Sequence, residues 1–201
     1  MNMLFHYHYW TPYVEETERF YVENGFNVKL RVGKYNGEFQ EFSPPLKWDD
    51  FRHKSVMFRI IEVRKGNVNI TFGYGKKVKF DHIGYFVSSE CHDMICENAQ
   101  KLRWKTEIDA RRTFIKTPYG FRIELQTHPD LIDSHESIYI KNLKLQTNKV
   151  GLNRDLEILF NNTFEHIEIE IGDEVKIADV EFKGVYVEKQ MDPNGVEILG
   201  L

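Results

Sequence analysis

Apolar and polar residues alternate from the start of the chain. In the opening FHYHY segment, Phe5, Tyr7 and Tyr9 share one face, and His6 and His8 share the other. A period of two is the mark of a β-strand, so we expect a strand here with both histidines on one side. The tyrosine side is expected to face the core.

The next segment has the signals of a helix. Thr11 and Pro12 suit a helix start, and Glu15 and Glu16 place negative charge in the first turn, where it is favoured. Gly25 suits the left-handed residue that often follows a helix. We therefore expect a helix between the first strand and Gly25.

Three strands are expected after this helix, near residues 26–32, 55–64 and 67–74. Residues 33–54 contain glycines, a proline pair and an aspartate pair, which predicts a long surface loop. Loops of this length usually have a role, and a lid over a pocket is a common one. The first unit is therefore a strand, a helix and three strands.

A second stretch repeats this order. His82 lies in an alternating strand that opens at Phe80, and a helix is expected to run to about Trp104. Strands are then expected near 106–110, 112–117 and 120–128. In the last of these strands, Glu124 lies on the polar face with Arg122.

The rest of the chain has the same order a third time. After a linker at 128–137, we expect a strand at 138–147, a helix near 151–161 and strands at about 165–171, 175–188 and 195–201. This copy has Asn142 where His82 stands and Leu199 where Glu124 stands. The predicted fold class is α+β, with paired units at 1–77 and 78–130 and a third unit, without the histidine and glutamate, at 136–201.

Composition excludes several classes of protein. The 201 residues are 41% hydrophobic and 14% aromatic, which is typical of a packed globule. The net charge is -4 and no basic cluster is present, so we expect no nucleic-acid partner. No apolar run approaches the roughly 18 residues of a membrane span, and we expect a cytoplasmic protein with reduced thiols at Cys91 and Cys96.

The repeated strand-helix-strand order, with a histidine in the first strand and a glutamate in the last, resembles the vicinal oxygen chelate superfamily. This group includes glyoxalase I, bleomycin-resistance proteins, fosfomycin-resistance proteins and extradiol dioxygenases. The resemblance covers residues 3 to about 128 and depends on His6 with Phe20-Tyr21 and Gly25-Phe26, on His82, and on the TPYGFRIE segment from Thr117 to Glu124. It implies tandem βαβββ units that form curved sheets around a cavity.

In that superfamily a divalent metal sits in the cavity, and the resemblance implies ligation by His6, His82 and Glu124. The metal would be Fe, Mn, Zn or Ni. Two imidazoles and one carboxylate leave coordination positions open for a substrate, whatever the family. His8 is the alternative to His6 as a ligand, although the spacing to Phe20 favours His6 and gives His8 a place in the pocket wall.

Basic residues on the strands suggest which substrate would bind. Arg31 and Arg122, together with Lys29, could place positive charge toward the cavity and favour an anionic substrate with several oxygens. A solvated strand face is an equally good interpretation of these residues. Tyr119, in the turn before the last strand of the second unit, is a candidate for the pocket rim.

Two positions bear on the reaction. Superfamily glyoxalases commonly use four ligands, but the first-unit position that matches Glu124 falls near Ile70, on a strand with no carboxylate. Extradiol dioxygenases use three ligands and share the Pro118-to-Glu124 ending, but their tyrosine ten residues before the glutamate is Phe114 here. Because a phenyl ring cannot transfer a proton, that route to ring cleavage is disfavoured.

The sequence therefore predicts a metal-dependent enzyme that acts on a small molecule through two adjacent oxygens. Its reaction type and catalytic residues are left open. The alternative is a metal-free, bleomycin-resistance-like protein that sequesters a ligand. The third unit should either cover a sheet of the first two or meet a second copy of the chain, and we favour a homodimer.

Overall fold

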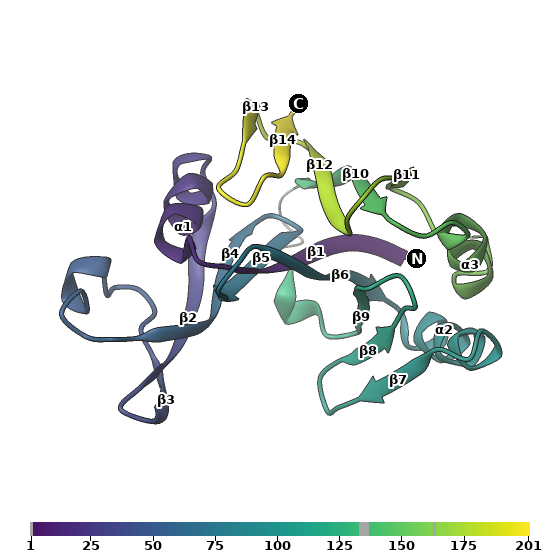
Figure 1. The fold of residues 1–201 in the computed structure, drawn as a ribbon, viewed down its shortest axis with the longest axis horizontal. Coiled ribbons are helices and arrows are strands. Elements are labelled where there is room, and N and C mark those ends of the chain that lie inside the picture. The colour runs from purple at the N-terminus through teal and green to yellow at the C-terminus, as the bar shows by residue number, and fades with distance from the viewer. Residues whose placement is uncertain (1, 133–136, 163) are drawn as a thin grey trace.

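The computed structural model describes residues 2–132, 137–162 and 164–201 and confirms the α+β class. These residues form a nine-stranded sheet of order β3-β2-β4-β5-β1-β6-β9-β8-β7 and a five-stranded sheet of order β11-β10-β12-β14-β13. The five-stranded sheet lies over one face of the nine-stranded sheet, whose two ends bend away from it (Figure 1).

The first two units together make the nine-stranded sheet. In each unit the first strand pairs in parallel with the last one, and the two first strands, β1 and β6, pair antiparallel at the centre. The first unit consists of β1 (Asn2–Thr11), α1 (Val14–Glu23), β2 (Asn27–Tyr35), β3 (Glu38–Glu41), the short 3-10 helix η1 (Trp48–Asp50), β4 (Met57–Lys65) and β5 (Val68–Tyr74). The second consists of β6 (Lys79–Val87), α2 (Ser89–Lys101), β7 (Lys105–Ile108), β8 (Thr113–Lys116) and β9 (Arg122–Gln126), followed by the 3-10 helix η2 (Pro129–Leu131).

The third unit has a similar element order but a different strand pairing. It consists of β10 (Tyr139–Thr147), α3 (Leu152–Leu159), β11 (Ile167–Ile171), β12 (Lys176–Lys183), β13 (Val187–Met191) and β14 (Glu197–Gly200). Here the strand after the helix, β11, pairs directly and in parallel with β10, and β14 pairs with β12. The third unit therefore has five strands, as the first unit does, but they form a separate sheet with a different strand order.

The space between the two sheets is the core of the molecule. Tyr7 and Tyr9 are buried there, as expected from the alternation in β1. Ring contacts join the sheets at Phe26 and Phe182, with centroids 5.7 Å apart, and at Tyr85 and Phe160, at 4.6 Å. The third unit thus covers the sheet of the first two, which was one of the two expected arrangements. The homodimer stays a prediction.

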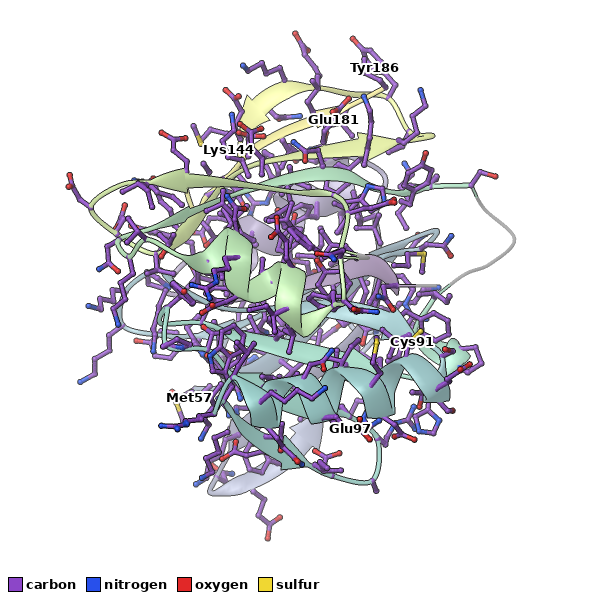
Figure 2. The ribbon with its side chains drawn as sticks, turned by 90° about the vertical axis from the view of Figure 1, so that its right-hand side faces the viewer. Met57, Cys91, Glu97, Lys144, Glu181 and Tyr186 are labelled. Atoms are coloured by element: carbon purple, nitrogen blue, oxygen red, sulfur yellow. The ribbon has the colours of Figure 1, made fainter. Side chains whose placement is uncertain are left out.

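Helices α2 and α3 lie one above the other on the same side of the molecule, as Figure 2 shows, where Cys91 and Glu97 mark α2. The side-chain amide of Asn98 in α2 donates to the carbonyl of Leu159 in α3 at 3.2 Å. Cys91 and Cys96 both lie in α2 and are partly buried. Among the described residues, no helix has the length and apolar character needed to cross a bilayer.

Three local expectations were wrong or incomplete. The loop expected at 33–54 is shorter, because β2 runs on to Tyr35 and forms a hairpin with β3. The strand expected at 175–188 is two strands, because Gly184 adopts a left-handed φ of 82° between them. The linker expected at 128–137 begins with η2, and its residues 133–136 lie outside the described residues.

Two β-bulges interrupt the pairing of β1 with β6. Leu4 pairs with Tyr85 and His6 with Gly84, so Phe5 is the extra residue on β1. This bulge overturns the expected alternation, because Phe5 lines the cavity together with His6 instead of sharing a face with the tyrosines. The second bulge lies on β6, the strand of His82.

Candidate metal centre

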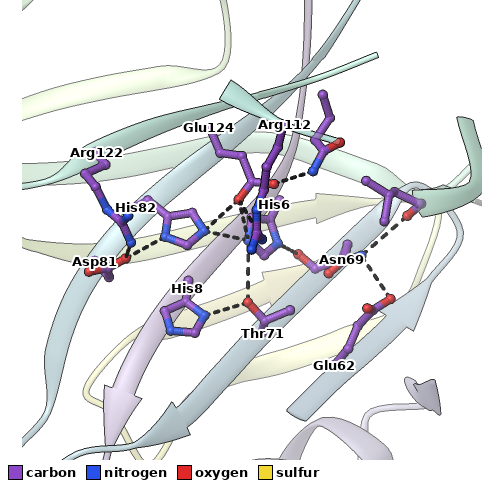
Figure 3. Close-up of polar contacts among 12 residues, drawn as sticks. His6, His8, Glu62, Asn69, Thr71, Asp81, His82, Arg112, Arg122 and Glu124 are labelled. Carbon is purple, nitrogen blue, oxygen red and sulfur yellow. Dashed lines mark hydrogen bonds and ion pairs between the residues drawn. The ribbon is translucent and has the colours of Figure 1, made fainter. Parts of the chain in front are cut away.

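His6, His82 and Glu124 converge on one point of the concave face of the nine-stranded sheet (Figure 3). They come from β1, β6 and β9, which are adjacent central strands. Gly84 pairs with His6 on one side and with Glu124 on the other, so these two residues flank the same position of β6. All three side chains are buried, with 5%, 5% and 3% exposure respectively.

The converging atoms are two imidazole nitrogens and one carboxylate oxygen. Nε2 of His6 lies 3.0 Å from Nε2 of His82, and Oε2 of Glu124 lies 3.0 Å from Nε2 of His82 and 3.9 Å from Nε2 of His6. Ligand atoms about 2.1 Å from one metal ion stand roughly 3.0 to 3.4 Å from each other in octahedral or tetrahedral geometry. Two of the three separations therefore match a metal-ligand set, and the 3.9 Å separation between His6 and Glu124 is longer than that range.

Both histidines have the other ring nitrogen occupied. Nδ1 of His6 donates to the carbonyl oxygen of Asn69 at 2.9 Å, and Nδ1 of His82 donates to Oδ2 of Asp81 at 2.7 Å. A proton held on Nδ1 leaves the lone pair of a neutral imidazole on Nε2. Both lone pairs then point at the position that Glu124 also faces, which is the arrangement that supports a metal-bound histidine.

Burial sets the protonation state of this site. Burial is the main cause that lowers the pKa of His6 to about 4, although Glu124 opposes the shift. Burial by itself would raise the pKa of Glu124, but the nearby imidazoles of His82 and His6 and the amide of Gln126 lower it to about 2. At neutral pH the site thus offers a neutral imidazole beside a carboxylate, as a divalent ion requires.

The two carboxylate oxygens of Glu124 differ in their hydrogen bonding. Oε1 accepts a hydrogen bond from the side-chain amide of Gln126 at 2.5 Å. Oε2 is buried and has no hydrogen bond of good geometry among the described residues, although His82 lies close by. A buried carboxylate oxygen without a donor calls for a cation, so the residues present fit a divalent metal.

His8 lies beside the three converging residues but does not join them. Its ring stacks on that of His82, with centroids 5.0 Å apart and planes inclined by 5°. Its Nδ1 lies 2.7 Å from Oγ1 of Thr71, and its buried Nε2 has no partner among the described residues. His8 thus lines the cavity, while His6 belongs to the group of three residues that could hold a metal ion.

Arg122 also lines the cavity, and it is neutralised by Asp81, to which its guanidinium donates. Burial would raise the pKa of Asp81, but hydrogen bonds from His82 and Arg122 keep it well below its usual range. The Arg122 guanidinium lies 4.1 Å above the ring of Phe114, which itself touches His82 with centroids 5.0 Å apart. The charge of Arg122 is therefore paired with Asp81, the residue that also holds the ring of His82.

Two residues expected at the site lie elsewhere. Arg31 is buried against α1, where it forms a bidentate ion pair with Glu18 at 2.6 and 2.7 Å. Its guanidinium also donates to two backbone carbonyls. Tyr119 donates its hydroxyl to Asp155 of α3 at 2.8 Å and joins the second unit to the third. Neither residue lines the cavity, because each side chain points away from the concave face.

No pattern in the sequence indicated that Asp81 is a partner of His82. Neighbouring residues in a regular strand point to opposite faces, so a contact between the side chains of Asp81 and His82 is not expected from a regular strand. In the structure, His8 pairs with His82 and Tyr9 with Phe80, which makes Asp81 the extra residue of the second bulge. The two bulges are therefore placed alike. Phe5 comes immediately before His6 on β1, and Asp81 comes immediately before His82 on β6.

Strand pairing also corrects the fourth-ligand position. Glu124 pairs with Gly84, two residues after His82, and Thr71 pairs with His8, two residues after His6. The first-unit equivalent of Glu124 is therefore Thr71 and not Ile70, which is buried in the core. A threonine hydroxyl is no substitute for a carboxylate ligand, so the described residues offer three candidate ligands here.

The cavity over these residues has a volume of about 310 Å³. Its wall combines polar side chains with rings and aliphatic groups, among them Phe5, Trp10, Leu30, Arg59, Ile60, Glu62, Asn69, Arg112, Phe114 and Leu131. Such a volume suits a small molecule, and a few convergent polar groups in a partly apolar wall are typical of a ligand site.

Solved structures of dioxygenases share the fold of this chain. Homoprotocatechuate 2,3-dioxygenase from Arthrobacter globiformis matches with a TM-score of 0.63 and 14% identity, over 99% of this chain and 79% of that one. 2,2',3-Trihydroxybiphenyl 1,2-dioxygenase from Sphingomonas wittichii strain RW1 matches with a TM-score of 0.69 and 11% identity, over 100% and 90%. BphC, a halotolerant catechol dioxygenase, matches with a TM-score of 0.63 and 10% identity, over 99% and 86%.

At these identities the likeness concerns the fold. No protein-family model matches the sequence, and no curated protein matches it. The resemblance read from the two histidines and the glutamate is thus confirmed at the level of fold.

Proposed function

We propose that this chain is a metal-dependent enzyme that acts on a small molecule through two adjacent oxygen atoms. The observation that carries the proposal is the convergence of Nε2 of His6, Nε2 of His82 and Oε2 of Glu124 on one buried point of a cavity. The solved proteins of similar fold are named as dioxygenases, which supports an enzyme of this kind.

The residues divide into those that hold the ion and those that shape the cavity. A divalent ion held by His6, His82 and Glu124 would act as a Lewis acid that polarises the oxygens of a bound substrate. Asp81 and the carbonyl of Asn69 fix the ring orientation of the two histidines. Fe, Mn, Zn and Ni all accept this donor set.

Phe114 restricts the reactions that this site can support. It pairs with Glu124 across β8 and β9, and its ring lies against His82. The guanidinium groups of Arg112 and Arg122 lie 5.2 and 4.1 Å from the centre of this ring. A phenyl ring can exclude water and pack against a substrate, but it cannot hold a proton. Ring cleavage that needs a tyrosine at this place is therefore disfavoured.

The second candidate is a metal-free protein that sequesters a small ligand in the same cavity. It is favoured by the 3.0 Å distance between Nε2 of His6 and Nε2 of His82, which suits a direct hydrogen bond between the two rings when one of them carries a proton on Nε2 as well as on Nδ1. Such a protein would keep the fold and the cavity and would bind its ligand without an ion.

Calorimetric titration separates the two candidates. Metal-free protein would be titrated with Fe(II) under anaerobic conditions and with Mn(II), Zn(II) and Ni(II). The enzyme proposal predicts one ion per chain, and loss of that binding in the Glu124→Gln variant with an unchanged fold. Glu107→Gln, on the exposed strand β7, is the matched control and should bind as the parent does. Absence of saturable binding by any of the four ions would overturn the proposal.

A further inference from the structure

A row of stacked groups leads from the candidate metal centre to the rim of the cavity. The ring of His82 stacks on that of His8 at 5.0 Å, and the edge of His8 meets Trp10 at 4.7 Å between centroids. The guanidinium of Arg59, from β4, lies 4.3 Å above the ring of Trp10. Arg59 and all three rings line the same cavity.

Trp10 is held in place from two sides. Its indole N–H donates to Oδ1 of Asp81 at 3.3 Å. Gly73 pairs with Trp10 across β1 and β5, and a β-carbon on Gly73 would lie 2.7 Å from Cζ3 of the indole ring. The chain thus leaves room for the indole beside β4, where its face supports the guanidinium of Arg59.

Arg59 differs from the other arginines of the cavity in having no acidic partner. Arg122 is paired with Asp81, and Arg112 lies within 3.7 Å of Asp109 and 4.0 Å of Glu124. No carboxylate among the described residues lies within ion-pair distance of Arg59. A guanidinium that is stacked on an indole and has no carboxylate partner is well suited to bind a planar oxyanion with two parallel hydrogen bonds.

We propose that Arg59, supported by Trp10, binds a carboxylate of the substrate. The inference rests on the proposed function, because it places this carboxylate in the same molecule as the two oxygens that face His6, His82 and Glu124. His8 pairs with His82, and Trp10 lies two residues further along β1, a step of roughly 7 Å in a strand. That step is about the distance between a ring oxygen and a carboxylate at the opposite end of a six-membered ring, so the substrate is a compact ring-sized acid whose carboxylate lies opposite its two chelating oxygens.

Two probes of the same size test the inference: 3,4-dihydroxybenzoate and 4-methylcatechol, which differ in carrying a carboxylate or a methyl group. Their dissociation constants would be measured by calorimetry with metal-loaded and metal-free protein. The expected result is roughly tenfold tighter binding of the carboxylate probe to the parent, the effect of one charge-assisted contact. The Arg59→Gln variant should bind both probes equally, and Arg59→Lys should keep part of the preference.

The control is Arg19→Gln, which removes an equal charge from the exposed face of α1 and should leave the preference unchanged. Melting curves of all variants establish that each is folded. Equal binding of the two probes by the parent, binding of neither, or an undiminished preference in Arg59→Gln overturns the role of Arg59. Binding of 4-methylcatechol that is the same with and without metal counts against the proposed function instead, and leaves the carboxylate preference to be judged by itself.

Discussion

The imidazole of His6 occupies the space that a side chain at Gly84 would need. A β-carbon built on Gly84 would lie 2.8 Å from Cβ and 3.0 Å from Cδ2 of His6. Glycine inside a strand often marks such a close approach, and here it allows His6, a candidate metal ligand, to lie close to the neighbouring strand. The geometry of the metal centre therefore depends on a residue that contributes no ligand.

Substitution of Gly84 by alanine should displace His6. We expect an overpacking cost of about 1–3 kcal/mol in the free energy of unfolding and a marked loss of metal affinity. Chemical denaturation and metal titration would measure the two effects. Tyr85→Phe is the control, because it changes the next residue of β6 on the core face and removes a hydroxyl that has no partner among the described residues. Unchanged metal affinity in Gly84→Ala would show that His6 is not a ligand.

Asp81 should act on metal affinity through His82. Its replacement by asparagine exchanges a charged acceptor for a neutral amide, so the proton on Nδ1 of His82 is held less firmly and Nε2 becomes a weaker ligand. We expect metal affinity to fall by about 10–100-fold, as is usual for such partners.

Metal titration of the Asp81→Asn variant would measure that loss. Asp93→Asn is a matched control, because Asp93 also contacts a neighbouring histidine, His92, at 3.1 Å, but on the exposed face of α2. A comparable loss in both variants would contradict the assigned role of Asp81.

Periodicity predicted most of the helices and strands, and the family resemblance then implied the fold and the three converging residues. The alternation in β1 and β6 places His6, His8 and His82 on strands, and the turn before β9 locates Glu124. Strand pairing then brings these residues together, as the resemblance implied.

Features that depend on contacts between distant segments could not be predicted in this way. The bulges at Phe5 and Asp81 change which side chains face the cavity, and a bulge leaves no mark in a single strand's alternation. The burial of Arg31 depends on Glu18, thirteen residues earlier, and on the carbonyls of the segment after β3. The cavity role of Arg59 depends on Trp10, which lies two strands away in the sheet.

Arg31 should contribute to stability and not to ligand binding. Its side chain and that of Glu18 are both about 6% exposed, and removal of one partner from a buried pair leaves an uncompensated charge. Arg31→Ala should therefore lower the free energy of unfolding by about 3–5 kcal/mol. In contrast, Arg19→Ala, which breaks an exposed pair with Glu15, should cost at most about 1 kcal/mol.

Urea denaturation of the two variants would test this difference, with metal titration of the folded protein as the second readout. Equal costs for Arg31→Ala and Arg19→Ala would contradict the stabilising role of the buried pair. A selective loss of metal binding in Arg31→Ala, without a loss of stability, would indicate that Arg31 acts at the metal centre.

Asp192 should make stability depend on pH. Its buried carboxylate accepts the hydroxyl of Tyr21 at 2.9 Å and the backbone N–H of Val196 at 2.9 Å, and so joins α1 to the third unit. Burial raises the pKa of Asp192 above its usual value. A raised pKa in the folded state favours folding below the unfolded-state pKa of about 3.9, and this contribution is lost as pH rises through the folded-state pKa.

The Asp192→Asn variant cannot ionise and therefore does not lose this contribution. Its stability relative to the parent should thus rise between about pH 3 and pH 7. Thermal or urea unfolding at several pH values would measure the trend, with Asp173→Asn as a control in a turn of the third unit. A difference between variant and parent that stays constant with pH would contradict the raised pKa.

The central claim is that His6, His82 and Glu124 hold one metal ion. Its most direct test is elemental analysis by inductively coupled plasma mass spectrometry, on protein purified without chelator or metal-affinity resin and then reconstituted with Fe(II), Mn(II), Zn(II) or Ni(II). We expect close to one ion per chain in the parent. In the folded His82→Ala, Glu124→Ala double variant, we expect only a small fraction of that metal content. Equal metal content in parent and double variant, or none in either after reconstitution, would contradict it.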